Sequence, residues 1–402
     1  MPTASTATPT PAAAIADWRT FPVTHTVSST TIADGAVQVQ WTDGRHSAFH
    51  FAWLRDNCPC AHCVYPLTRE QVFEVADMPD TLAPQRVQAD AAGDLHIAWA
   101  DDHTSAFHAG WLRAHAYDDA SRLERSRAVP QPQLWGAERQ QSLPCFDFAA
   151  VMADDAVLHR WLLAVRDVGL TLVQGVPTEV GTVGTVAKRI SFIRESNFGV
   201  LFDVASKPNP DSNAYTSFNL PPHTDLPTRE LQPGLQFLHC LVNGAEGGDS
   251  VFVDGFAVAA ALREACAEDF DVLTRTPVEF RNKDPHTDYR CLAPIILLNP
   301  AGGVVEVRFA NFLRGPFDVP ADRMALLYRA YRHLTQLARE SRFRVVRRLQ
   351  PGDMWVFDNR RVLHARTAFD PATGNRHLQG CYIDRDELLS RIRILERTPS
   401  LP

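Results

Sequence analysis

The chain has 402 residues, of which 45% are hydrophobic, and a formal net charge of −7. This length allows a catalytic domain and a smaller domain with large buried cores, and the acidic balance without a run of Lys or Arg makes nucleic acid a poor partner. No stretch approaches the roughly 20 consecutive apolar residues that a membrane span needs, so no membrane partner is expected.

Residues 1–20 are rich in Ala, Thr and Pro, and we expect a flexible tail there. The segment has no Lys or Arg before Arg19 and no long apolar region, so it resembles neither a secretory signal nor an Arg-rich transit peptide. We therefore expect a cytoplasmic protein. Three of the eight Cys are clustered and five are scattered in apolar contexts, which favours a metal site and buried thiols over a disulfide framework.

An imperfect internal repeat follows the tail. The sequence WTDGRHSAFHFAWLR begins at Trp41, and WADDHTSAFHAGWLR begins at Trp99, 58 residues later. Each copy has the pattern of a strand, a turn, a second strand and a short helix. Two copies are too few for a solenoid, so we predict a compact, pseudo-duplicated β-rich domain over residues 21–120.

A cysteine cluster, DNCPCAHC, lies in the first copy of this repeat. It consists of Cys58, Cys60 and Cys63. A tetrahedral Zn²⁺ needs a fourth ligand. His62 lies inside the turn and would point elsewhere, whereas His103 is the better candidate, because the first repeat has Arg45 at the equivalent position. We predict a structural zinc that joins the two half-modules and has no open position for chemistry; a reduced Cys cluster without metal is the alternative.

A polar, Pro-containing segment predicts a linker over residues 121–145, and we expect the second domain over residues 146–402. Near its start, DDAVLHRWLLAVRDVG has apolar residues at helical spacing, with Asp154 and Asp155 near the beginning and Gly169 near the end. The next segment, LTLVQGVP, predicts a buried strand, and TVGTVAKRISFIRE predicts a second helix.

From Tyr215 onward the pattern changes to short strands separated by Gly, Pro and Asn. The expected strands are LQFLHCLV, SVFVDGF, VEFRN, APIILLN, VVEVRFAN, RVVRRL, DMWVFDN and HLQGCYID. One helix, roughly Ala321 to Glu340, is expected to interrupt them. This pattern is typical of a double-stranded β-helix, or jelly roll. The predicted fold is therefore mainly β with flanking helices, a jelly-roll catalytic domain following a small zinc-binding domain.

A metal site is predicted between the sheets of this jelly roll. Side chains alternate along a strand, so His223 and Asp225 in PPHTDLP project to the same face. With His364 from a distant strand they form the two-His-one-carboxylate pattern, which leaves positions on Fe(II) open for a cosubstrate and O2. A lone His-x-Asp is most often a surface accident, so its companions matter. Arg376 can clamp the far carboxylate of a dicarboxylic cosubstrate, and Ser250 offers a hydroxyl to the same group; an ordinary surface ion pair and a strand decoration are their alternatives.

With these motifs in place, the chain resembles the taurine-dioxygenase-like Fe(II)/2-oxoglutarate oxygenases, and among them the hydroxylases of γ-butyrobetaine and trimethyllysine. The resemblance rests on AYTSFNLPPHTDLP, PGLQFLHCL, GGDSVFVDGF, RNKD, FDNRRVLHARTAFD and RHLQGCYIDRDEL in that order. It runs from about residue 40 to the C-terminus and includes the Cys-rich module. It implies that iron and 2-oxoglutarate bind at the residues named above, with ascorbate as a candidate activator. It also favours His103 as a zinc ligand and a homodimer.

The resemblance implies hydroxylation of γ-butyrobetaine at C3 to L-carnitine, coupled to oxidative decarboxylation of 2-oxoglutarate to succinate and CO2. A trimethylammonium group donates no hydrogen bonds and is held by aromatic faces. The residues aligned with the family's cage are Phe198, Phe202, Tyr215 and Tyr382. Aromatic residues on strands belong most often to the core, which is the alternative for each of them.

The polar end of the substrate is assigned to Asn311 in RFANFLRGPF, which matches a substrate-carboxylate Asn of the family; a cap on a strand turn is the alternative. Two departures change the pocket: Leu226 stands where an animal relative has Tyr, and Ser212 replaces an Asn. The alternative substrate is trimethyllysine, whose α-amino group needs extra partners. A non-catalytic interaction protein built on the zinc module is the alternative from another class, and the presence of all three iron ligands argues against it.

Overall fold

The computed structural model describes residues 21–205, 216–284 and 286–397. The expectations for the tail over residues 1–20, for Ser212 and for Tyr215 lie outside the described residues. The chain divides into two compact units between Pro130 and Gln131. Within the described part of the chain, no helix has the length and apolar character to span a bilayer.

The first unit contains two three-stranded antiparallel sheets, β1-β2-β3 and β4-β5-β6. Its elements are β1 Val27–Ala33, β2 Ala36–Trp41, β3 His46–His50, α1 Phe51–Asp56, a 3-10 turn Val75–Asp77, β4 Pro84–Ala89, β5 Leu95–Trp99, β6 Thr104–Phe107, α2 Ala109–Ala114 and α3 Asp119–Ala128. Helix α3 occupies the start of the segment expected to be a linker. It forms because the Asp118 side chain accepts a hydrogen bond from the Ser121 amide, and because Arg125 and Arg127 lie in its last turn.

The internal repeat has a direct structural counterpart, since β2, β3 and α1 recur as β5, β6 and α2. In each copy a buried Trp donates its indole N–H to a Ser hydroxyl, Trp41 to Ser47 at 3.0 Å and Trp99 to Ser105 at 2.9 Å. Both Trp residues belong to one shared hydrophobic core. The pseudo-duplication read from the sequence therefore corresponds to two matched strand-turn-strand-helix motifs.

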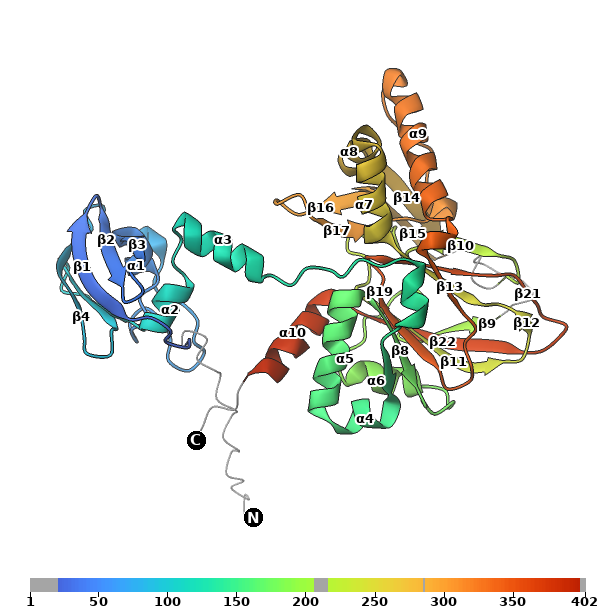
Figure 1. Ribbon diagram of the computed structural model, residues 1–402, viewed down its shortest axis with the longest axis horizontal. Helices are drawn as coiled ribbons and strands as arrows, with labels where there is room; N and C mark the ends of the chain where they lie inside the picture. The colour runs from blue at the N-terminus through green and yellow to red at the C-terminus, as the bar shows by residue number, and fades with distance from the viewer. Residues whose placement is uncertain (1–20, 206–215, 285, 398–402) are drawn as a thin grey trace, which may run out of the picture. The chain divides into compact units, whose positions relative to one another are not determined.

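The second unit contains most of the chain's regular structure (Figure 1). Its strands are β7 Cys145–Asp147, β8 Leu170–Gln174, β9 Phe202–Ala205, β10 Leu220–His223, β11 Leu235–Asn243, β12 Glu246–Gly247, β13 Ser250–Asp254, β14 Pro277–Lys283, β15 Asp288–Pro294, β16 Ile296–Leu298, β17 Val304–Val307, β18 Arg344–Arg347, β19 Met354–Asp358, β20 Val362–Arg366, β21 Phe369–Asp370 and β22 Arg376–Ile383. Its α-helices are α4 Phe148–Ala153, α5 Asp155–Val168, α6 Thr182–Lys188, α7 Gly255–Ala265, α8 Ala267–Arg275, α9 Ala321–Leu337 and α10 Arg385–Glu396. Short 3-10 turns span Ala137–Gln141, Asn311–Leu313 and Ser341–Phe343.

Two sheets form the centre of this unit, a six-stranded sheet β7-β8-β19-β11-β22-β9 and a four-stranded sheet β10-β20-β13-β18. All neighbouring pairs are antiparallel except β7 and β8. Phe252 of the smaller sheet packs against Trp355 and Phe357 of the larger sheet, with ring centroids 4.6 and 5.3 Å apart. Helices α5, α6 and α10 pack their apolar residues on the larger sheet (Figure 1). This arrangement confirms the predicted jelly roll.

The helices differ from the expectation in two respects. The predicted second helix ends early, at Lys188, because the Arg194 amide donates instead to the carbonyl of Tyr382 at 2.8 Å. The region expected to hold one helix also holds α7, α8 and α10. Helix α7 begins where the Asp254 side chain accepts from the Phe256 amide at 3.0 Å, and its Ala-rich sequence favours helix.

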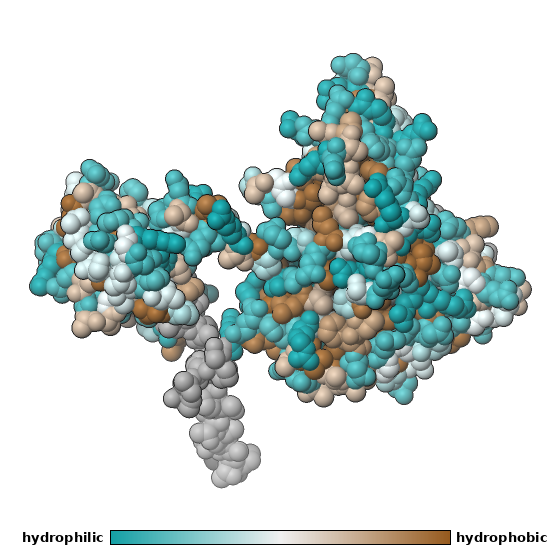
Figure 2. Space-filling model, in the orientation of Figure 1, coloured by the Kyte–Doolittle hydropathy of each residue, from teal (hydrophilic) through white to brown (hydrophobic). Residues whose placement is uncertain are grey.

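Helices α7, α8 and α9 share one hydrophobic core beside the jelly roll. The side of α9 visible in Figure 2 is mainly hydrophilic. Its buried residues, Leu327, Ala330, Tyr331, Leu334 and Leu337, recur at helical spacing. This amphipathic pattern fixes the helix against α7 and α8 and leaves the sheets to form the site.

Candidate active site

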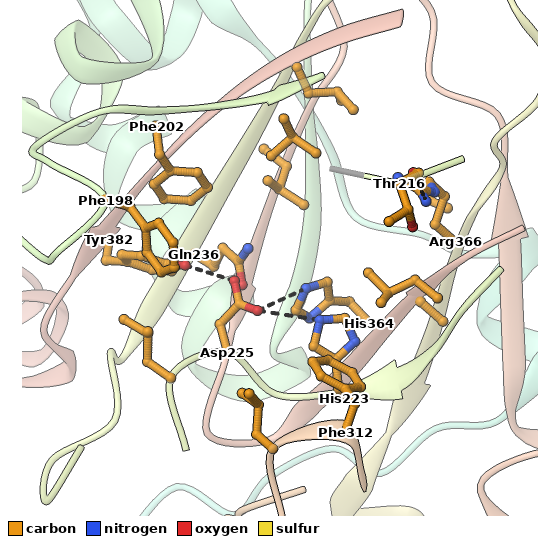
Figure 3. A pocket seen from close by; sticks show the side chains of 18 of the residues that line it. Phe198, Phe202, Thr216, His223, Asp225, Gln236, Phe312, His364, Arg366 and Tyr382 are labelled. Carbon is orange, nitrogen blue, oxygen red and sulfur yellow. Dashed lines mark hydrogen bonds and ion pairs between the residues drawn. The ribbon is translucent and has the colours of Figure 1, made fainter. Parts of the chain in front are cut away.

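The three side chains predicted as iron ligands converge between the sheets (Figure 3). His223 on β10 lies directly opposite His364 on β20, and their ring centroids are 4.1 Å apart. The Oδ1 atom of Asp225 lies 3.3 Å from Nε2 of His223 and 3.6 Å from Nε2 of His364. Two imidazole nitrogens and one carboxylate oxygen thus face one point, which is the donor set of a facial triad for Fe(II).

Hydrogen bonds orient two of these three side chains, His223 and Asp225. Nδ1 of His223 lies 2.9 Å from the carbonyl of Pro221, so the ring proton sits on Nδ1 and the lone pair on Nε2 faces the centre. The Tyr382 hydroxyl donates to Oδ2 of Asp225 at 2.7 Å and leaves Oδ1 for a metal. These partners fit an iron ion on the residues present.

The backbone of Asp225 is held by a side chain that the sequence analysis missed. Asn359 is buried, accepts a hydrogen bond from the Asp225 amide at 2.7 Å and donates to the Asp225 carbonyl at 3.0 Å. The next residue, Leu226, has a φ of 52°, in the left-handed region that disfavours side chains. Asn359 therefore stabilises the turn that points the carboxylate at the two imidazoles.

The electrostatics of the site favour a bound cation. Burial alone would raise the pKa of Asp225, but the two imidazoles and the Tyr382 hydroxyl hold this pKa well below its usual range. Burial and the neighbouring His223 lower the pKa of His364 to about 3. The carboxylate is therefore ionised and the His364 ring is neutral near pH 7, the protonation states that metal coordination requires.

A cavity of about 470 Å³ opens beside these three residues. Arg376 lines it, and burial together with the nearby Arg366 lowers the pKa of Arg376 to about 10. Ser250 also lines the cavity and lies directly opposite Arg366 in the paired strands. Arg376 and Ser250, the residues predicted for the cosubstrate, are thus brought into the same cavity as the three candidate ligands.

Arg366 was not among the predicted site residues, yet it lines the cavity and donates to the carbonyls of Thr216 at 2.7 Å and Phe218 at 2.8 Å. The sequence could have predicted this residue, because His364 and Arg366 are two positions apart on one strand and therefore share a face. Gln236 lines the cavity as well, opposite Tyr382 in the sheet.

Three of the predicted cage residues, Phe198, Phe202 and Tyr382, line one region of the cavity (Figure 3). The rings of Phe202 and Tyr382 stack with centroids 4.8 Å apart. Leu226 belongs to the same buried hydrophobic cluster as Phe202 and Tyr382. The arrangement can bind an apolar or quaternary ammonium group on aromatic faces.

Asn311 lies elsewhere. It is exposed, its Oδ1 accepts from the Tyr331 hydroxyl at 3.2 Å, and it is not among the described residues that line the cavity. Its neighbour Phe312 packs edge-on against His223, with centroids 5.1 Å apart. The lining amide from this side of the unit is Asn282 on β14. The assignment of Asn311 to the substrate stays a prediction.

The first unit holds the predicted cysteine cluster. Nε2 of His103 lies 3.2, 3.6 and 3.7 Å from the sulfur atoms of Cys58, Cys60 and Cys63. Ligand atoms on a tetrahedral Zn²⁺ with ordinary Zn–S and Zn–N bonds lie about 3.5 Å apart, so these four fit the metal. Burial raises the pKa of the Cys58 thiol to about 12, and Arg55 donates to the sulfur of Cys63 at 3.2 Å.

Two family models match the chain. The taurine catabolism dioxygenase TauD, TfdA family matches residues 126–382, and the gamma-butyrobetaine hydroxylase-like N-terminal model matches residues 30–113. Together they cover the jelly roll and the cysteine module, and they confirm the resemblance read from the motifs.

Three relatives extend the comparison along more than nine-tenths of the chain. A gamma-butyrobetaine dioxygenase of Pseudomonas sp. (strain AK-1) is 62% identical over 384 residues, which are 96% of this chain and 100% of that protein. The gamma-butyrobetaine dioxygenase of Homo sapiens is 33% identical over 92% of this chain and 98% of its own length. A trimethyllysine dioxygenase of Meyerozyma guilliermondii is 29% identical over 92% of this chain and 96% of its own.

Proposed function

Because the chain belongs to the TauD, TfdA family of dioxygenases, we propose that it hydroxylates γ-butyrobetaine at C3 to give L-carnitine, with 2-oxoglutarate and O2 as cosubstrates. The reaction converts 2-oxoglutarate to succinate and CO2, with one atom of O2 entering succinate and the other entering the product. The observation that carries the proposal is the 62% identity to a gamma-butyrobetaine dioxygenase over nearly the whole chain.

Iron(II) held by His223, Asp225 and His364 would supply the activation of O2 that both half-reactions need. The protein's part is to hold the donors in place. Pro221 fixes the tautomer of His223, and Tyr382 and Asn359 fix the carboxylate and backbone of Asp225. Such supporting hydrogen bonds keep the ligand geometry without rearrangement during turnover.

The cosubstrate end of the cavity is cationic. Arg376 presents a guanidinium that can bind the far carboxylate of 2-oxoglutarate with two parallel hydrogen bonds, and Ser250 can add a third. The Nε atom of Arg376 is buried without a described hydrogen-bond partner, which is a cost that a bound carboxylate would offset. Arg366 adds positive charge at the same end.

The substrate end is aromatic. Phe198, Phe202 and Tyr382 offer ring faces to the trimethylammonium group, each good contact contributing about 0.5–2 kcal/mol. Asn282 can donate its amide to the carboxylate at the other end of the substrate. With both ends of the substrate fixed, one C–H bond is held next to the iron site. This positioning accelerates the reaction, because the reacting groups are already in place.

We further propose that Cys58, Cys60, Cys63 and His103 bind a structural zinc ion, which fixes the strand-turn-strand motifs of the first unit to one another. Four protein ligands leave that ion no role in oxidation. The homodimer, the cytoplasmic location and activation by ascorbate stay predictions.

The test is anaerobic reconstitution with Fe(II) and 2-oxoglutarate, followed by air and either γ-butyrobetaine or trimethyllysine. Mass spectrometry follows succinate and hydroxylated product. The proposal predicts carnitine from γ-butyrobetaine and little product from trimethyllysine. Preferential hydroxylation of trimethyllysine would show that trimethyllysine is the preferred substrate. Absence of succinate from iron-loaded protein would contradict an oxygenase activity.

A further inference from the structure

Arg229, four residues after Asp225, joins two segments that both line the cavity. Its guanidinium carbon lies 3.3 Å from the centroid of the Tyr289 ring, and its Nη2 donates to Oδ1 of Asn197 at 2.8 Å. A cation this close to a ring face is a strong cation–π contact. One side chain therefore contacts a loop and a hairpin that are almost one hundred residues apart in sequence.

Each of these contacts lies next to a candidate substrate-binding residue. Asn197 directly precedes Phe198, one of the aromatic lining residues. Tyr289 on β15 pairs with Asn282 on β14, whose amide is one of two among the described residues that line the cavity. Arg229 thus connects the candidate ammonium-binding ring to the candidate carboxylate-binding amide.

The loop that carries Phe198 is closed on itself. The Ser196 amide donates to the Gly199 carbonyl at 3.1 Å, the Gly199 amide donates to the Ser196 carbonyl at 2.9 Å, and the Ser196 hydroxyl accepts from the Phe198 amide at 3.1 Å. These hydrogen bonds hold the loop in a compact conformation. The hydrogen bond that Asn197 accepts from Arg229 holds this loop at a set distance from the hairpin.

The base of Arg229 is fixed. Its carbonyl accepts a hydrogen bond from the buried Arg308 at 2.6 Å, and its amide donates to the Leu226 carbonyl at 3.2 Å. Arg308 in turn is paired with the buried Glu306 at 2.8 Å. The backbone of Arg229 is therefore held beside the turn that carries Asp225, and its guanidinium is held by Tyr289 and Asn197.

We infer that Arg229 is a positioning residue that sets the separation between Phe198 and Asn282 and thereby selects the chain length of a betaine substrate. The inference rests on the proposed function, because it takes Phe198 as the ammonium site and Asn282 as the carboxylate site. Among the described residues, the Arg229 side chain contacts Asn197 and Tyr289 and none of the three candidate iron ligands, so its effect is on binding and selectivity.

The experiment compares Arg229→Met with Arg290→Met, a matched control. Arg290 neighbours Tyr289 but is exposed, and it pairs only with the exposed Asp288 among the described residues. Purified iron-loaded variants are assayed with γ-butyrobetaine and with its homologue longer by one methylene. Arg229→Met is expected to raise KM for γ-butyrobetaine about tenfold, to leave KM for 2-oxoglutarate unchanged, and to shrink the preference over the longer homologue. Arg290→Met is expected to match the wild type.

Tyr289→Ala and the double variant test the pathway of the effect. If Arg229 acts through the ring, the two substitutions together should raise KM no more than either alone. An unchanged chain-length preference in Arg229→Met, or an equal rise in KM for 2-oxoglutarate, would overturn the inference.

Hydrogen exchange of residues 195–200 separates this inference from the proposed function. The positioning role predicts faster exchange of the loop in Arg229→Met than in Arg290→Met, with unchanged exchange in β11 and β22. If the wild type hydroxylates neither betaine, the proposed function fails, and the exchange result alone decides whether Arg229 holds the loop; equal exchange in the two variants would refute it.

Discussion

The hydroxyl of Tyr382 donates a 2.7 Å hydrogen bond to Oδ2 of Asp225, across 157 residues of sequence. The ring of the same residue stacks on Phe202 and lines the cavity. Tyr382 therefore supports the candidate iron ligand with its hydroxyl and lines the candidate substrate pocket with its aromatic ring. Iron binding and substrate binding are physically joined at this residue.

Tyr382→Phe should separate the two roles, because it removes the hydrogen bond and keeps the ring. We expect the affinity for Fe(II), or for Mn(II) as a redox-inert probe, to fall about 10- to 100-fold, as for other residues that support metal ligands. KM for γ-butyrobetaine at saturating iron should change little. Titration of the metal by calorimetry checks this, and unchanged metal affinity would show that the hydrogen bond has no supporting role.

Two asparagines, Asn282 and Asn311, are candidates for binding the substrate carboxylate. Asn282 lines the cavity, whereas Asn311 is exposed and bonded to Tyr331. Asn282→Ala should raise KM for γ-butyrobetaine about tenfold, since it removes a hydrogen bond to a charged group, and Asn311→Ala should leave KM near the wild-type value. Steady-state kinetics decide between them. The reverse pattern would return the role to Asn311, as the sequence resemblance suggested.

Arg376 should control the 2-oxoglutarate requirement. Replacing it with Met removes the bidentate donor and keeps the length of the side chain, so KM for 2-oxoglutarate should rise about 100-fold or more. Mn(II) affinity without cosubstrate should stay the same, because Arg376 is not a ligand candidate. A 2-oxoglutarate dependence equal to that of the wild type would refute the clamp.

The cysteine cluster should hold zinc independently of iron. Cys58→Ala and His103→Ala should each remove one equivalent of zinc by elemental analysis and lower the melting temperature of the first unit, because metal binding and folding are linked. Iron content after reconstitution should be unchanged. The control is Cys145→Ala, which alters an exposed cysteine outside the cluster. Wild-type protein that purifies without zinc and does not take it up would contradict the assignment.

Much of the architecture could be predicted because the signals are local. The repeated motif at Trp41 and Trp99 encodes its own strands, turn and helix within fifteen residues, and His223 and Asp225 lie within one tripeptide. Helices α7 and α8 were missed because their apolar residues follow a run of strands and only the Asp254 cap marks where the period changes.

The supporting residues of the site could not be predicted because they depend on tertiary contacts. Asn359 reaches Asp225 across 134 residues, and Tyr382 reaches it across 157. Nothing in the local sequence around Asn282 indicates that β14 contributes to the cavity. Arg366 is the exception, since its spacing from His364 on one strand places both on the same face.

The measurement that tests the central claim most directly is a single-turnover reaction under ¹⁸O2. Iron(II)-loaded protein is mixed with 2-oxoglutarate and γ-butyrobetaine, and the products are analysed by mass spectrometry. The account predicts carnitine and succinate in equal amounts, with one ¹⁸O atom in each. Succinate that forms without hydroxylated γ-butyrobetaine, or carnitine without the label, would contradict it.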